Sequence, residues 1–151
     1  MTMTLTTPAF IENSTLPTRY TCDGEDVSPA FSWQNAPKNT QAFALVCHDP
    51  DAPGGTFYHW VIYNIPKNMN SLAEGVKTLP TGAIVGKSSW GKPQYNGACP
   101  PRGSTHHYIF TLYALDAPLS LSAHADGQTV EAAVSGHVLE KASVTAIYQR
   151  E

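Results

Sequence analysis

The sequence predicts a mainly β fold, an antiparallel β-sandwich with one helix in its C-terminal part and short peripheral helices. Short apolar runs rich in aromatic and β-branched residues favour strands, and 12 prolines and 11 glycines break the 151-residue chain into short segments. This length is typical of one domain with a sizeable core. Because no internal repeat or linker divides the chain, we expect a single domain over residues 1–151.

Three apolar segments are the expected central strands, residues 43–47, 60–65 and 108–115. Proline follows the first two closely, at Pro50 and Pro66, and the third is the richest in aromatic and β-branched side chains. Apolar and polar residues alternate again near the end of the chain, at Val144, Ala146 and Tyr148. This alternation predicts a closing strand with one face toward solvent.

The expected helix covers residues 129–142, which are rich in Ala and Val. Glu131 near its start and Lys141 near its end have the charges that the helix dipole favours, and Asp126 or Thr129 can cap it. A second, shorter helix is expected around residues 68–75.

Composition excludes several classes of partner. The net charge is −3 and no Lys/Arg cluster is present, so neither nucleic acid nor an anionic membrane surface is expected as the main partner. No apolar run approaches the roughly 20 residues that cross a bilayer, so no integral membrane association is expected. The Thr-rich N-terminus lacks the charged and apolar regions of a secretory signal. We therefore expect a cytoplasmic protein.

The three cysteines, Cys22, Cys47 and Cys99, are odd in number and show no C-x-x-C spacing. Together with a cytoplasmic location, this favours three reduced thiols, and a bridge between two of them is the alternative. Cys99 lies in a loop rich in Gly and Pro, so it is the cysteine expected to border a pocket.

Two clusters of polar residues carry the functional prediction, residues 48–60 and 95–108. Each places a Pro/Gly loop beside an expected strand, with a histidine at the junction, and such loops suit the wall of a preformed pocket. Along the third strand His106 and Tyr108 share one face and His107 points the opposite way.

These clusters resemble the two signatures of the phosphatidylethanolamine-binding family, also called Raf kinase inhibitor-like proteins. The first is Asp49-Pro50-Asp51-Ala52-Pro53 leading into His59-Trp60, and the second is residues 97–103 followed by residues 106–110. Residues 21–29 are similar to the bacterial and archaeal branch. The resemblance implies a β-sandwich with one anion-binding cavity, formed at the matching positions Asp49, Pro53, His59, Gly97, Cys99, His106 and Tyr108.

The sequence also departs from the family pattern. The loop between Asp51 and His59 is short, one residue fewer separates Gly103 from His106 than in eukaryotic members, and His107 stands where the family often has Arg. Kinase regulation, known for eukaryotic relatives, is therefore not transferred to this chain. A homodimer is expected from the bacterial relatives.

A small anion fits the chemistry of these residues, because imidazole and loop N–H groups donate to phosphate oxygens and Asp49 can orient a histidine. We expect a non-enzymatic protein that binds phosphate, a phosphomonoester or a phosphoethanolamine-like ligand, without cofactor or metal. Alternatives are a buried His–Asp network that only orders the core, a metal site, a surface inhibitor of kinases or proteases, and a hydrolase. A hydrolase would use His59 or His106 as its base, with a nucleophile among Ser88, Ser89 and Ser104.

Four further expectations concern side chains that are not among the predicted ligand-binding residues. Asp51 is expected to brace its own loop through backbone N–H groups, and Arg102 to be an exposed loop cation. His48 is expected to face away from Asp49. The three tryptophans are expected to pack in the core or on the sheet, or to form an aromatic rim around the pocket: Trp33, Trp60 and Trp90.

Overall fold

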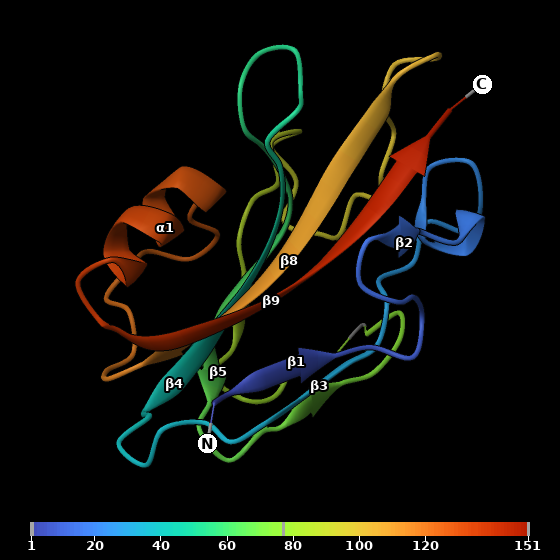
Figure 1. Cartoon of the computed structure of the whole chain (residues 1–151). Helices are drawn as coiled ribbons and strands as arrows, with labels where there is room; N and C mark the ends of the chain where they lie inside the picture. The colour runs from blue at the N-terminus through green and yellow to red at the C-terminus, as the bar shows by residue number, and fades with distance from the viewer. Residues whose placement is uncertain (1, 77, 151) are drawn as a thin grey trace.

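The computed structural model describes residues 2–76 and 78–150, and two β-sheets dominate it (Figure 1). The strands are β1 (Thr4–Thr6), β2 (Ser14–Thr15), β3 (Phe31–Gln34), β4 (Ala42–Asp49), β5 (Phe57–Pro66), β6 (Ser71–Leu72), β7 (Ile84–Val85), β8 (Thr105–Leu115) and β9 (Val138–Gln149). The helices are the 3-10 helix η1 (Thr18–Tyr20) and the α-helix α1 (Gly127–Val134). The predicted mainly β fold with one C-terminal helix is confirmed.

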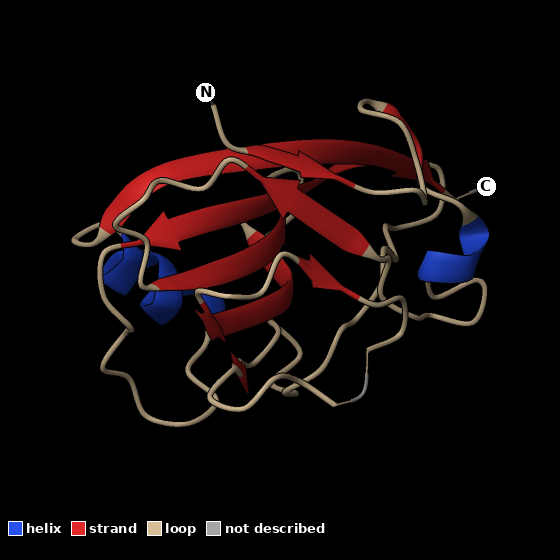
Figure 2. Ribbon diagram, turned by 90° about the horizontal axis from the view of Figure 1, so that it is seen from below, coloured by secondary structure: helices blue, strands red, loops and turns tan. Residues whose placement is uncertain are grey.

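The smaller sheet has the order β1-β3-β6 and the larger has the order β2-β9-β8-β4-β5-β7. All strand pairs in both are antiparallel except the short pair of β2 with β9, which is parallel. The long strands form one continuous layer, with α1 toward one end of the molecule and η1 at the other (Figure 2).

The alternation of side chains along β4 divides the interior into two parts. Phe43, Leu45 and Cys47 face the main core, which also contains residues of the smaller sheet. Ala44 and Val46 face the opposite side and pack in a second cluster with residues of α1. The larger sheet is therefore covered by the smaller sheet on one face and by α1 on the other.

Helix α1 is shorter than predicted. Asp126 caps it by accepting a bond from the Thr129 backbone N–H at 2.8 Å, as expected, but the helix ends at Val134. The predicted extension to Ala142 is wrong, because residues 138–149 pair with β8 along nearly its whole length. Ala and Val are compatible with both helix and strand, so the pairing with β8 determines that these residues form a strand. The predicted helix at residues 68–75 is also wrong, since this segment contains strand β6.

Two tyrosines of the larger sheet anchor α1. The hydroxyls of Tyr58 and Tyr113 donate to the two carboxylate oxygens of Glu131, at 2.6 and 2.7 Å. Burial, together with the bond to Glu131, raises the pKa of both tyrosines above the ordinary value. Among the described residues, no helix has the length and apolar character needed to cross a membrane.

The expectation of three reduced cysteines is wrong. Cys22 and Cys99 form a disulfide across a sequence separation of 77, and Cys47 is a buried free thiol. The segment after η1 lies beside the second polar cluster, where Thr21 and Ala98 form an isolated parallel bridge. Cysteine spacing alone could not reveal this proximity.

Candidate binding pocket

A cavity of about 140 Å³ lies where the C-terminal end of β4, the start of β5 and the start of β8 come together. Its lining contains six of the seven predicted site residues, and the exception is Gly97. The lining residues are Asp49, Ala52, Pro53, Phe57, His59, Trp90, Cys99, Pro100, Pro101, His106 and Tyr108. Two segments far apart in the sequence therefore form one pocket.

Asp49 and His106 form a buried pair at the pocket. The Nδ1 atom of His106 lies 2.6 Å from Asp49 Oδ2, so the imidazole N–H donates to the carboxylate. The other oxygen, Oδ1, accepts the Asp51 backbone N–H at 2.8 Å and so fixes the start of the loop that follows β4. Since the protein engages Nδ1, the nitrogen of His106 that remains for a ligand is Nε2.

His59 is held by Asn96 through two bonds. Its Nδ1 donates to the Asn96 carbonyl oxygen at 2.7 Å, and its own carbonyl accepts the Asn96 backbone N–H at 2.9 Å. Burial lowers the pKa of His59 below its ordinary value, against the opposing effects of Asn96 and of the Asp49 charge. At neutral pH His59 is therefore uncharged, with Nδ1 protonated and Nε2 an acceptor.

A β-bulge explains how His59 reaches the pocket. Cys47 pairs with Trp60, but His48 pairs with Tyr58, so β5 has one extra residue at position 59. Bulges re-aim side chains, and here His59 lines the pocket while its neighbour Trp60 lies in the main core. A regular strand would send these two side chains to opposite faces.

Gly97 supports the pocket from behind its wall. Its backbone N–H donates to Asp26 Oδ1 at 2.8 Å, and a Cβ atom at this position would lie 2.3 Å from both Asp26 Oδ1 and the Tyr20 carbonyl oxygen. A side chain at residue 97 would force the loop or its neighbours to shift, so glycine is favoured here. Gly97 therefore positions the loop and does not itself line the cavity.

Aromatic side chains form one side of the pocket. Phe57 and Trp90 pack with ring centroids 4.4 Å apart, and Trp90 also lies 5.3 Å from the His59 ring. Trp33 and Trp60 are buried, as the first alternative predicts, and Trp90 lies at the rim with 47% of its surface exposed, as the second predicts. The hydroxyl of Tyr108 is buried and has no hydrogen-bond partner among the described residues.

Some lining residues were missed by the sequence reasoning. Phe57 precedes His59 by two residues in the strand, so its side could have been inferred from strand periodicity. Pro100 and Pro101 fall inside the second signature. Trp90 was expected at the rim only as one of three tryptophans, because no local signal separates it from the other two and only the tertiary fold brings it to the pocket.

Of three residues beside the pocket, Asp51 differs from the sequence expectation, whereas His48 and Arg102 agree with it. Asp51 does not brace its own loop but accepts the backbone N–H and the ring Nδ1 of His107, both at 2.8 Å, which ties the loop to β8. His48 lies on the α1 side of β4, with its ring 6.4 Å from the Tyr58 ring. Arg102 is exposed.

The serines that a hydrolase would use as nucleophiles lie outside the cavity. Ser88 donates to Asn96 Oδ1, Ser89 accepts the Tyr58 backbone N–H, and neither of these serines nor Ser104 lines the cavity. Within residues 2–76 and 78–150 no group of three or more His, Cys, Asp or Glu side chains is arranged to hold a metal ion.

A family comparison places this geometry among known proteins. Residues 6–149 match the model of the family described as phosphatidylethanolamine-binding protein. The chain belongs to this family. A UPF0098 protein of Methanothermobacter thermautotrophicus is 44% identical over 98% of this chain and 99% of its own length. The UPF0098 protein YbhB of Escherichia coli is 39% identical over 83% of this chain and 84% of its own length.

Solved structures agree with the family assignment. The crystal structure of Escherichia coli YbcL, described as a new member of the mammalian PEBP family, superimposes with a TM-score of 0.95 at 29% identity and covers 100% of both chains. The putative phosphatidylethanolamine-binding protein homologue CT736 of Chlamydia trachomatis gives a TM-score of 0.90 at 31% identity, over 99% of both chains. The resemblance predicted from the two signatures is thereby confirmed, including the bacterial and archaeal branch.

Proposed function

We propose that the pocket binds a small oxyanion, either phosphate or a phosphomonoester such as phosphoethanolamine, and that the protein acts by binding and not by catalysis. The observation that supports this proposal most directly is that His59 and His106 line one cavity and each use Nδ1 within the protein. Both Nε2 atoms thus remain for one ligand. The family's description as phosphatidylethanolamine-binding agrees with a headgroup of this chemistry.

Each residue has a defined part in this proposal. His106 and His59 donate through Nε2 to the anion when they are protonated, and such charge-assisted bonds are about twice as strong as neutral ones. Asp49 is a positioning residue, because its two oxygens already accept bonds from His106 and Asp51. The ring of Trp90 and the Pro100–Pro101 segment shape the mouth of the cavity. A ligand with so few atoms binds in the millimolar to micromolar range, at roughly −4 to −8 kcal/mol.

Calorimetry with phosphate and phosphoethanolamine tests this function. In acidic buffer, where His59 is protonated, we expect His59→Ala to weaken binding by about 1.5–3 kcal/mol, or roughly 10- to 150-fold, because a bond to a charged group is lost. The matched control is His137→Ala, which removes a histidine from an exposed pair with Asp116, a pair outside the cavity. Equal affinity of wild type and His59→Ala for both ligands would contradict the proposal and would indicate that the buried histidines only order the core.

A further inference from the structure

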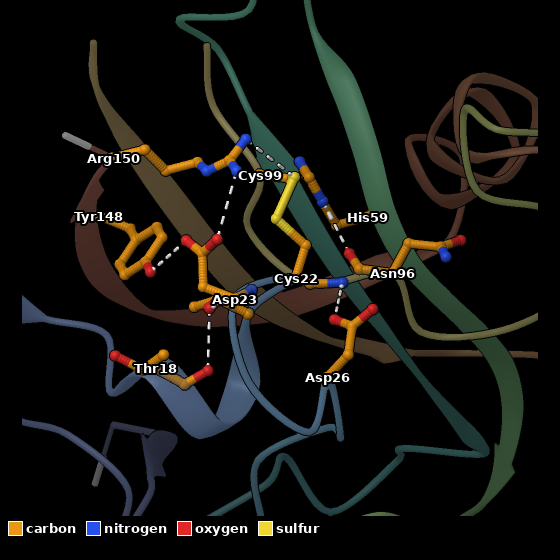
Figure 3. Close-up of a disulfide and its surroundings, with 11 residues drawn as sticks. Thr18, Cys22, Asp23, Asp26, His59, Asn96, Cys99, Tyr148 and Arg150 are labelled. Atoms are coloured by element: carbon orange, nitrogen blue, oxygen red, sulfur yellow. Dashed lines mark hydrogen bonds and ion pairs between the residues drawn. A yellow bond between two sulfur atoms is a disulfide. The ribbon is translucent and has the colours of Figure 1, made fainter. Parts of the chain in front are cut away.

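The Cys22–Cys99 disulfide lies in the wall of the pocket (Figure 3). Cys99 is half-buried and lines the cavity, whereas Cys22 belongs to an exposed segment that follows η1. A thiol in solvent therefore has easier access to the sulfur atom of Cys22 than to that of Cys99.

Arg150 gives the two sulfur atoms different electrostatic surroundings. Its Nη1 lies 3.6 Å from Cys99 Sγ, while Nη2 pairs with Asp23 at 3.3 Å (Figure 3). Asp23 is itself held by the Tyr148 hydroxyl at 2.7 Å, which keeps the guanidinium beside Cys99. The Nε of Arg150 is buried and has no partner among the described residues. A neighbouring guanidinium favours a thiolate, so Cys99 is the better leaving group of the two.

Hydrogen bonds hold the segment around Cys99 independently of the disulfide. The Cys22 backbone N–H donates to the Ala98 carbonyl at 3.1 Å, and the Gly97 N–H donates to Asp26. The Tyr95 hydroxyl also donates to the Tyr20 carbonyl oxygen at 2.7 Å. Because these bonds do not involve sulfur, they keep Cys99 at the cavity wall after the disulfide opens.

We propose that Cys99 is a masked nucleophilic thiol of the pocket, which a dithiol reductant releases by attack at Cys22 and which then reacts with small soft electrophiles. One thiolate of the reductant forms a bond to Cys22 Sγ, the Cys22–Cys99 bond breaks, and its electron pair stays on Cys99 as a thiolate. The second thiol of the reductant then displaces Cys22, which takes up a proton. The dithiol is oxidised to a disulfide and the protein disulfide is reduced.

Cys47 supplies an internal control for this reaction. It is a free thiol buried in the main core, and burial together with the Asp49 charge raises its pKa well above the ordinary value. It therefore stays unreactive in the folded protein and reacts only when the core opens. Alkylation of Cys47 thus reports unfolding in the same sample.

The test is alkylation by iodoacetamide after treatment with dithiothreitol, followed by peptide mass spectrometry over time. We expect Cys99 to react several-fold faster than Cys22, because the neighbouring Arg150 guanidinium favours its thiolate, with Cys47 unlabelled. Arg150→Gln should remove the difference between Cys99 and Cys22. Lys141→Gln, which deletes an exposed positive charge from β9, should leave the difference intact.

Three results would overturn the proposal. The first is a reaction of Cys22 that is as fast as that of Cys99. The second is simultaneous labelling of Cys99 and Cys47, which would mean that the disulfide opens only on unfolding. The third is a failure of Cys99 to react in the variant Cys22→Ser, which has a free Cys99 thiol without any reductant. This result counts only if circular dichroism shows that the variant is folded. None of these results depends on phosphate binding.

Discussion

Reduction of the Cys22–Cys99 disulfide should lower the free energy of unfolding by an amount that follows from the loop it closes. The bond joins residues separated by 77 positions, and closing a loop of this size removes chain entropy from the unfolded state worth about 4.5 kcal/mol. The hydrogen bonds around Ala98 and Gly97 persist in the reduced native state, so little native energy is lost with the bond. Nearly the whole effect is therefore expected from the unfolded chain.

Urea unfolding followed by tryptophan fluorescence measures this loss. With a slope of about 2 kcal/mol per molar urea, the midpoint should fall by about 2 M on reduction of the wild type. The control is the double variant Cys22→Ala with Cys99→Ala, whose midpoint should match that of the reduced wild type and should not respond to reductant. A shift below about 0.5 M in the wild type would refute the chain-entropy reasoning.

Three further predictions address single residues in the pocket or directly behind its wall. Gly97→Ala should lower the melting temperature by about 5 °C, since its Cβ would lie 2.3 Å from Asp26 and Tyr20 oxygens; an unchanged melting curve would contradict this. Tyr108→Phe should leave the urea midpoint unchanged or raise it, because the buried hydroxyl has no partner among the described residues; a loss above about 1 kcal/mol would reveal a structural bond. Phosphate affinity should be higher at pH 5.5 than at pH 7.5, because burial lowers the pKa of His59 and its imidazole therefore gains a charge only in acidic solution. Calorimetry should detect proton uptake on binding, and equal affinity at the two pH values would exclude a charged His59.

Local patterns were sufficient to predict the central strands. Segments 43–47, 60–65 and 108–115 fall within β4, β5 and β8, because a short apolar run that is rich in aromatic and β-branched residues favours a strand over a buried helix. The pocket could be located because both of its segments carry long signatures in the correct order. The ligand-binding role of these residues stays a prediction.

The remaining features depend on distant contacts that spacing does not encode. The end of α1 at Val134 is set by the pairing of β9 with β8, and Ala-rich sequence gives no sign of it. The Cys22–Cys99 bond requires the segment after η1 to lie beside residue 98. Trp90 reaches the rim only through the packing of its loop against Phe57 and His59.

The position of the pocket follows from the order of the strands in the larger sheet. β4 lies between β8 and β5, so Asp49 at its end is flanked by the starts of both neighbours. His106 occupies the start of β8, and its alternation with Tyr108 directs both side chains to the same cavity. His59 lies three residues into β5 and beside core residue Trp60, so regular alternation could not place both side chains on this face. The bulge at His59 removes this conflict, and without it the cavity would have one histidine instead of two.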